Sequence, residues 1–309
     1  MLEVRPFARH DRNGLTSLVN RHIAAVLPGG AVPVAALLSQ LEHDAQEPIV
    51  DPWVIDRRAI VGIANDRVVA AAYLKRYAAD DRPSDSYRDA GEIHWLVFDP
   101  SAGHAGRQVL EAAMTQLRDW RSRAWYADGT LPCLGVYGVP DAWPHVQRLL
   151  AEVGFDDRDG QIEVLFAGDL AQAPPPGAPP KADLQLRRCV GTWGTAFEAY
   201  RAGTIVGAFE VEADYGVTNS LLAGWVDVAN HWVAAEHRGG GIGTWLFRHG
   251  CDWLRTAGKQ RLLAYAIERP SRHAAGEEPP SIERTRRYLE RQGLVPLTRT
   301  RRGWSRPPD

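Results

Sequence analysis

The strongest constraint on the fold is a run of glycines between an apolar segment and an amphipathic one. Trp232-Val233-Ala234 leads into Arg238-Gly239-Gly240-Gly241-Ile242-Gly243, and Thr244-Trp245-Leu246 continues with helical spacing. A strand, a glycine-rich turn and a helix in this order direct several backbone N–H groups and the positive end of a helix dipole at one point. Glycine has no Cβ, so a phosphate can approach the backbone closely. The segment therefore predicts a pyrophosphate-binding site.

Two familiar phosphate-binding motifs fit this spacing poorly. The dinucleotide fingerprint requires G-x-G-x-x-G, and the P-loop requires a G-K-[ST] sequence that does not follow here. From Arg238 to Gly243 the segment closely resembles the R/Q-x-x-G-x-G/A signature of the GNAT superfamily of acyl-CoA-dependent N-acetyltransferases. Val233 before the loop and Leu246 after it also stand at the family spacing.

The resemblance implies an α/β fold with a mixed sheet, acetyl-CoA or a related acyl-CoA as cosubstrate, and no metal. In such folds an amine attacks the thioester directly. The strand before the loop separates from its neighbour to bind the pantetheine arm, and one of its N–H groups, here that of Val233, stabilises the oxyanion. The cosubstrate contacts implied by the resemblance are Val233, Ala235, Arg238, Gly239, Gly240, Gly241, Ile242, Gly243 and Thr244.

Two side chains on the predicted strand are candidate general bases. Histone-acetylating members of the family carry a glutamate six residues before the strand valine, where this chain has Asp227. Strict alternation places Asp227, Ala229, His231 and Val233 on one face, so Asp227 and His231 are both candidates. The alternatives are a solvated edge carboxylate and a packing histidine.

The general acid is less well defined. The family pattern Y-x-x-x-G-F corresponds to Leu289 through Leu294, so a leucine stands at the tyrosine position. Tyr288 is one residue early, a rotation of about 100° on a helix. We keep Tyr288 as a candidate acid and expect it to pack rather than to protonate a thiolate.

A proline-rich segment divides the chain of 309 residues. Consecutive prolines lack backbone donors and favour an extended spacer, and Pro174–Pro180 contains five of them. We predict a first domain over residues 1–168, a linker over 169–182 and a second domain over 183–309.

The elements expected in the two domains follow one order. Residues 2–6, 59–64, 67–73, 93–98, 134–139 and 161–166 are predicted strands of the first domain, and 11–27, 105–120 and 143–153 are predicted helices. The strands predicted in the second domain are 184–190, 196–201, 205–213, 225–233, 261–267 and 294–300, with helices at 243–257 and 282–292. The second domain lacks the early helices. The result is a mixed α/β layout in tandem.

One offset supports duplication of a GNAT-like domain. Val97 and Val233 are each followed thirteen residues later by a helical leucine, at an offset of 136 residues. With this offset the first copy has Ala102–Arg107 in place of the glycine loop and Gly91 in place of Asp227. We therefore expect a degenerate N-terminal copy that binds no CoA.

Composition and charge argue against several classes of protein. A formal net charge of −2 gives no basic field for a nucleic acid, and no apolar run reaches the length of a membrane span. The N-terminus does not resemble a signal peptide, so we expect a cytoplasmic protein. Cys133, Cys189 and Cys251 are too widely spaced for a zinc motif or a disulfide framework.

The predicted function is transfer of an acyl group from acetyl-CoA to a primary amine of a small molecule. Two alternatives stay open: a CoA-binding regulatory module without turnover, and an acetyltransferase that acts on peptides or proteins. The sequence defines neither the acceptor nor the oligomeric state.

Overall fold

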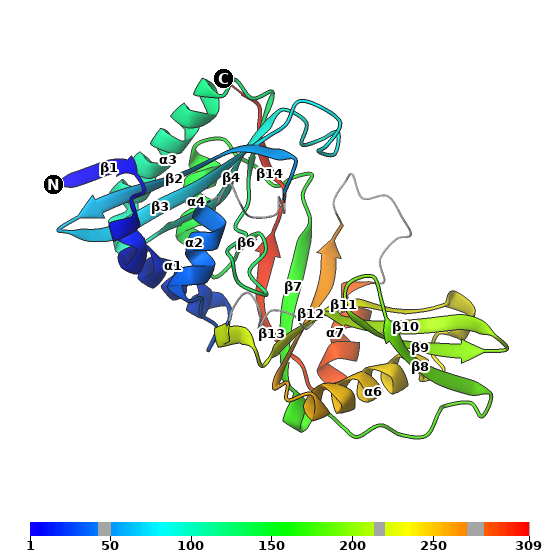
Figure 1. Cartoon of the computed structure of the whole chain (residues 1–309). Coiled ribbons are helices and arrows are strands. Elements are labelled where there is room, and N and C mark those ends of the chain that lie inside the picture. Colours follow the sequence, from blue (N-terminus) through cyan, green and yellow to red (C-terminus); the bar gives the residue numbers. More distant parts are fainter. Residues whose placement is uncertain (43–50, 213–219, 271–280, 309) are drawn as a thin grey trace. The chain divides into compact units, whose positions relative to one another are not determined.

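A computed structural model describes residues 1–42, 51–212, 220–270 and 281–308 (Figure 1). Its contacts divide the chain into two compact units, each described separately below. Unit 1 contains Met1–Glu163, Arg269–Glu277 and Thr298–Asp309, and unit 2 contains Val164–Glu268 and Glu278–Leu297. These units are not continuous in sequence, whereas the predicted domains at 1–168 and 183–309 are. The predicted boundaries stay a prediction about segments that fold on their own.

Unit 1 is built on a six-stranded sheet in the order β1-β2-β3-β4-β5-β14. Its strands are β1 (Leu2–Pro6), β2 (Val54–Ala64), β3 (Arg67–Tyr77), β4 (Ala90–Phe98), β5 (Ala124–Ala127) and β14 (Trp304–Arg306). Its helices are α1 (Arg12–Val26), α2 (Val34–Leu41), α3 (Gly103–Asp119) and α4 (Pro144–Glu152). A short pair, β6 (Val139–Pro140) with the end of β13 (Val295–Arg301), is also present.

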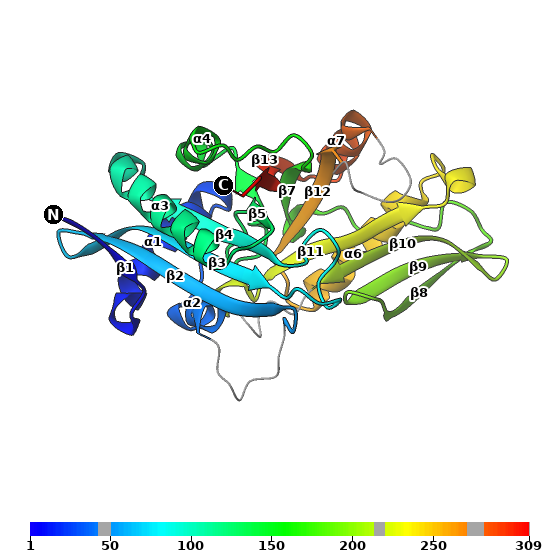
Figure 2. The ribbon, with the colours of Figure 1, turned by 90° about the horizontal axis from the view of Figure 1, so that it is seen from above.

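Opposite faces of this sheet carry different helices (Figures 1 and 2). Gly62 on β2 lies close to Val109 of α3, which fixes α3 on one face. Tyr73 points to the other face, where its hydroxyl donates to the Gln40 carbonyl of α2 at 2.7 Å. The β2–β3 hairpin turns through Asn65 and Asp66, both with positive φ, which is typical of a two-residue hairpin turn.

Unit 2 contains strands in the order β7-β12-β11-β10-β9-β8. They are β7 (Ile162–Asp169), β8 (Leu184–Val190), β9 (Thr195–Arg201), β10 (Thr204–Glu212), β11 (Trp225–Val233) and β12 (Arg261–Arg269), with helices α6 (Ile242–Thr256) and α7 (Ile282–Arg291). Only a short turn joins β8 to β9, so the early helices are absent there, as predicted.

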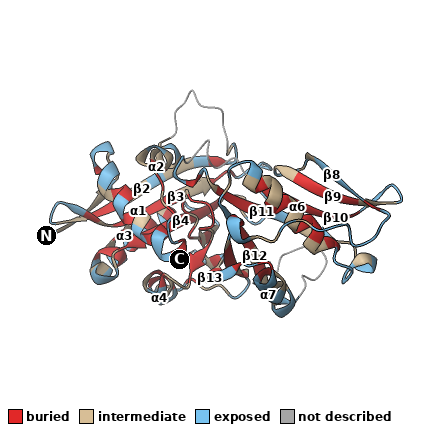
Figure 3. Ribbon diagram, turned by 90° about the horizontal axis from the view of Figure 1, so that it is seen from below, coloured by how far each residue is buried: buried red, intermediate tan, exposed pale blue. Residues whose placement is uncertain are grey.

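The core of unit 2 lies between α6 and one face of its sheet. Phe209, Val226 and Leu262 from the strands pack with Leu246 and Phe247 of α6, and all five side chains are buried. Figure 3 shows the buried residues following the strands and one side of α6. This packing is what fixes the start of α6 relative to the end of β11.

One strand prediction in the first domain is wrong, and one strand was missed. Residues 134–139 were expected to form a strand, but only Val139 and Pro140 do so, and the parallel neighbour of β4 is β5. The last strand of that sheet, β14, was not predicted. Three residues flanked by Gly303 and two prolines are too short to show a periodic pattern.

Among the described residues, no helix is both long and apolar enough to cross a membrane.

Candidate functional site

The predicted phosphate loop lies between the end of β11 and the first turn of α6. Gly239 and Gly241 have φ values of 79° and 86°, which side-chain-bearing residues rarely adopt. Gly241 is the N-cap of α6 and no side chain caps it, so the N–H groups of the first turn point outward. A Cβ at Gly239 would meet nothing within 4 Å. The loop therefore fits a diphosphate that approaches the backbone directly.

The predicted contact residues divide by exposure. Ala235, Arg238, Gly239, Gly240 and Gly241 are exposed, and Gly243 and Thr244 are half-buried. The Ile242 side chain is buried in the core, so only its backbone can face a ligand. The Arg238 Nε donates to the Val233 carbonyl at 2.9 Å, which closes the loop back onto the end of β11.

Strands β11 and β12 run side by side only at their beginnings. Their parallel register covers Trp225–Asp227 with Arg261–Leu263 and ends there, although each strand continues for six more residues. On its other edge β11 stays paired with β10 as far as Val233. The Ala234 N–H donates to the Val206 carbonyl at 3.0 Å, so alternation turns the backbone groups of Val233 toward the β12 side. This is the separation expected for a pantetheine arm.

A β-bulge overturns the prediction that Asp227 and His231 share a face. Glu210 pairs with Asn230 and Val211 pairs with Val228, so Ala229 is the extra residue. The alternation shifts by one at Ala229. Phe209 and His231 then point to the α6 side of the sheet, whereas Asp227 points to the opposite side.

Asp227 is held in place by a residue that the sequence did not single out. Its carboxyl group is buried, with 6% of the residue exposed, and the Tyr265 hydroxyl donates to Oδ2 at 3.0 Å. Tyr265 lies on β12, two residues beyond Leu263, the register partner of Asp227. A sequence prediction that paired β11 with β12 in parallel would have placed Tyr265 near Asp227. Asp227 therefore has a fixed orientation beside the point where the strands separate.

His231 has the environment of a packing residue. Its Nε2 lies 3.2 Å from the Gly243 carbonyl and its ring contacts Phe209 and Phe247. Burial lowers the pKa of His231 to about 4, so the ring is neutral near pH 7 and its Nε2–H donates to the carbonyl. A Cβ at Gly243 would lie 3.3 Å from the same Nε2. His231 thus fixes the last glycine of the loop against β11.

Tyr288 also lies at the loop end of the site. Its ring centroid is 5.4 Å from that of His231, and burial raises the pKa of its hydroxyl above the usual range. Leu289, at the family's tyrosine position, is a buried core residue. Tyr288 therefore borders the first turn of α6 and not the bulge near Asp227.

The same bulge occurs in unit 1. Tyr73 pairs with Trp95 and Leu74 with Ile93, so His94 is the extra residue of β4. Glu92 precedes His94 by two positions, as Asp227 precedes Ala229. The expectation that Gly91 replaces Asp227 is therefore wrong, because the two bulges, at Ala229 and His94, are 135 residues apart and not 136 (229 − 94 = 135), which aligns Asp227 with Glu92. Glu92 is buried and accepts a hydrogen bond from the Tyr77 hydroxyl at 2.6 Å.

The loop of unit 1 differs from that of unit 2. Helix α3 begins at Gly103, five residues after the end of β4, whereas α6 begins nine residues after the end of β11. A Cβ at Gly106 would lie 2.6 Å from the Phe98 ring. The centroid of the Phe98 ring is 4.7 Å from that of the His145 ring. Aromatic rings pack where unit 2 has its open loop.

Comparison with known proteins agrees with this geometry. Residues 166–276 match the acetyltransferase (GNAT) family. A tandem GNAT protein from the clavulanic acid biosynthesis pathway superposes over 100% of this chain and 99% of its own, with a TM-score of 0.64 and 14% identity. The chain has the tandem GNAT fold.

A second solved structure also aligns over nearly the whole chain. A GCN5-related N-acetyltransferase from Sphaerobacter thermophilus aligns over 99% of this chain and 95% of its own, with a TM-score of 0.63 and 14% identity. No curated protein matches the sequence significantly. The likeness to the tandem GNAT protein, which covers the whole chain, confirms the predicted fold class of two tandem GNAT-like domains.

Proposed function

We propose that unit 2 transfers an acyl group from acetyl-CoA, or a related acyl-CoA, to a primary amine of a small molecule. The observation that carries the proposal is the separation of β11 from β12 between an open glycine loop and a fixed carboxylate. The loop suits the diphosphate, the unpaired edge of β11 suits the pantetheine arm, and Asp227 lies near the end of the paired segment.

Each residue then has a distinct part in the reaction. Acetyl-CoA supplies a thioester carbonyl that a neutral amine can attack. The Val233 N–H is oriented to donate a hydrogen bond to the carbonyl oxygen as negative charge develops there. Asp227 accepts the proton of the attacking amine through a chain of waters, because it precedes Val233 by six residues of strand, about 20 Å at full extension. The C–N bond forms as the C–S bond breaks, and CoA leaves as its thiolate.

The burial of Asp227 supports a small acceptor. A carboxylate with 6% exposure is reached more readily by a slender amine than by a side chain on a folded protein. Tyr265 anchors one carboxylate oxygen and so fixes the orientation of the group.

The test is thiol release from acetyl-CoA with a panel of free amines and lysine peptides, with products identified by mass spectrometry. We expect acetylated small amines. CoA binding without thiol release for any acceptor would favour the regulatory module instead. Acetylation confined to peptides would favour the protein acetyltransferase.

A further inference from the structure

Tyr265 lies just beyond the point where the paired segment of β11 and β12 ends. Its hydroxyl donates to the Asp227 Oδ2 at 3.0 Å, and it follows Leu263, the register partner of Asp227, by two residues. Its strand neighbours Ala264 and Ala266 belong to the core against α6, so alternation turns Tyr265 to the opposite face, where Asp227 also lies. The two side chains therefore meet where the strands separate.

The two oxygens of the Asp227 carboxyl group differ in access. Oδ1 is buried from solvent, and Oδ2 accepts the hydrogen bond from the Tyr265 hydroxyl. Asp227 is 6% exposed, whereas Tyr265 is half-buried and is the more accessible member of the pair. A hydroxyl that donates one hydrogen bond keeps lone pairs with which it accepts another. A proton carried by waters can therefore enter at the Tyr265 Oη and does not have to reach the carboxylate itself.

The position of Tyr265 along the strand also suits this path. Strands β11 and β12 are parallel, so a residue beyond Leu263 lies nearer to the level of Val233 than Asp227 does. Two residues of strand span about 7 Å. The backbone groups of Val233 face the β12 side. Tyr265 is therefore on the side of Asp227 from which the proton of the attacking amine comes.

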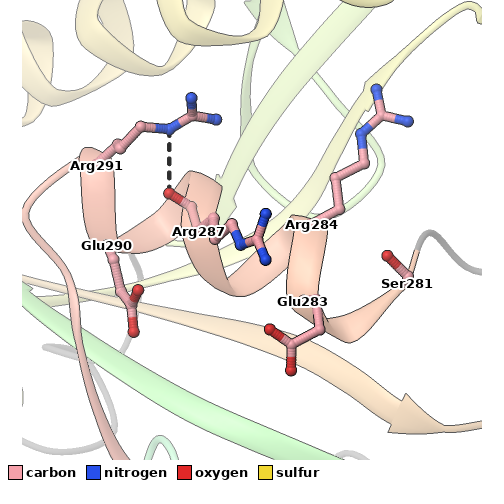
Figure 4. A pocket seen from close by; sticks show the side chains of 6 residues that line it. All are labelled: Ser281, Glu283, Arg284, Arg287, Glu290 and Arg291. Atoms are coloured by element: carbon pink, nitrogen blue, oxygen red, sulfur yellow. Dashed lines mark hydrogen bonds between the residues drawn. The ribbon is translucent and has the colours of Figure 1, made fainter.

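The other tyrosine of the site, Tyr288, offers no comparable path. Its hydroxyl is hydrogen-bonded to Thr244 in the first turn of α6, and burial raises its pKa. A hollow of about 620 Å³ beside α7 is lined by other side chains of that helix and its start (Figure 4), namely Ser281, Glu283, Arg284, Arg287, Glu290 and Arg291. Of the two tyrosines, Tyr265 is the one that donates to a carboxylate.

Unit 1 has a carboxyl group at the position that corresponds to Tyr265. Glu92, the counterpart of Asp227, is the register partner of Tyr126 on β5. Asp128 stands two residues beyond Tyr126, where unit 2 has its phenol. The copy without the glycine loop thus also lacks a tyrosine–carboxylate pair between these two parallel strands.

We propose that Tyr265 is the proton relay between the attacking amine and Asp227. The inference rests on the function proposed for unit 2 and deepens it. As the C–N bond forms, the proton of the amine passes through the waters to the Tyr265 Oη, while the proton that the hydroxyl held passes to the Asp227 Oδ2. The C–S bond breaks and CoA leaves as its thiolate. Asp227 ends the step protonated, and the phenol is neutral before and after it.

The first test is Tyr265→Phe in the full chain, assayed by thiol release from acetyl-CoA with a small primary amine. This change leaves the ring in place and removes the hydroxyl that connects the waters to the carboxylate. We expect kcat to fall on the order of 10²-fold, the lower end of what proton transfer by a side chain contributes. The KM for the amine and the CoA affinity from calorimetry should change little.

Tyr200→Phe is the matched control, because it removes the hydroxyl of another tyrosine–carboxylate pair. The Tyr200 hydroxyl donates to Glu198 at 2.8 Å on β9, which is separated from β12 by β10 and β11. This variant should keep the wild-type kcat.

A second variant distinguishes a relay from a side chain that only orients Asp227. Tyr265→3,5-difluorotyrosine keeps the ring and the hydrogen bond to Asp227, but its hydroxyl is more acidic and its oxygen is less basic. A relay predicts a lower kcat and a fall in rate that begins at lower pH, where the phenol loses its proton. A residue that only orients the carboxylate predicts the wild-type rate and pH profile.

The inference is overturned if Tyr265→Phe keeps the wild-type kcat, or if the difluorotyrosine variant keeps the wild-type rate and pH profile. Either result leaves acyl transfer by unit 2 intact. If wild type releases no thiol with any amine, the proposed function fails and the relay fails with it.

Discussion

Asp227 is the residue whose replacement tests the chemistry most directly. Asp227→Asn keeps the shape of the side chain and an oxygen for Tyr265, but it removes the proton acceptor. We expect kcat to fall roughly 10²- to 10⁴-fold, the usual effect of losing a general base, with CoA affinity nearly unchanged. High pH should restore part of the rate because free amine accumulates. Steady-state kinetics across pH, with calorimetry for CoA, measure both effects.

His231 supplies the contrasting variant. It points to the other face of the sheet and donates to Gly243, so His231→Ala should affect CoA binding more than proton transfer. Wild-type turnover in Asp227→Asn combined with lost turnover in His231→Ala would make His231 the base.

Gly241 tests the loop. Its φ of 86° disfavours a branched residue, and a side chain there would also crowd the phosphate cradle. Gly241→Val should weaken CoA binding by on the order of 2 to 4 kcal/mol, from lost charge-assisted hydrogen bonds and strain. Gly258→Val is the matched control. Gly258 has a φ of 75° and open space at the far end of α6, so its variant has similar strain without touching the loop. If Gly241→Val and Gly258→Val lose CoA affinity equally, backbone strain explains the loss and the loop does not.

The buried His231 ring also predicts a pH dependence of stability. Its pKa is about 4 in the folded state and about 6.5 when unfolded. The unfolded chain therefore binds the proton more readily between these values. The stability that neutral His231 contributes is complete above about pH 6.5 and is lost as the pH falls toward 4. Urea unfolding of His231→Gln should show a flatter dependence of unfolding free energy on pH in this window. An unchanged slope would contradict the assignment.

At the scale of elements, the short strand β14 is expected to contribute much to the stability of unit 1. It pairs with β5, and its Trp304 is 6% exposed. The Arg306 Cζ lies over the Trp125 ring, 5.6 Å from the ring centroid. The Arg306 side chain also donates to the Val153 carbonyl at 2.7 Å. Deleting residues 303–309 should cost unit 1 at least about 2 kcal/mol, the value of burying one large apolar side chain. Chemical unfolding measures the loss, and deletion of only 307–309 should be almost neutral.

The sequence predicted elements better than it predicted their pairing. Helices such as α1 and α6 have long apolar stripes, so their bounds were close. The bulges at Ala229 and His94 have no signature in composition, yet each one reverses the face of every residue beyond it. That is why the place of the glycine loop between a strand and a helix could be predicted, whereas the relation of Asp227 to His231 and its contact with Tyr265 required the structure.

At the scale of the whole chain, the two copies have diverged unevenly. Both keep the bulged strand with a buried carboxylate two residues before the bulge, Glu92 in unit 1 and Asp227 in unit 2. Only unit 2 keeps the glycine loop. The first copy therefore keeps the buried carboxylate without the glycine loop, and its Glu92 is hydrogen-bonded to Tyr77 and His94.

This divergence predicts that one chain binds one CoA. In unit 1 the connection from strand to helix is shorter, it lacks the arginine and glycine pair, and the Phe98 ring lies against Gly106. A phosphate there would meet no exposed row of backbone N–H groups like that after Gly241. Calorimetric titration should give a stoichiometry of one, and Gly241→Val should remove that single transition. Gly103→Val is the control in unit 1, because its φ is helical and open space surrounds it. Two equivalent sites, or a transition that survives Gly241→Val but not a change in unit 1, would show that the first copy also binds CoA.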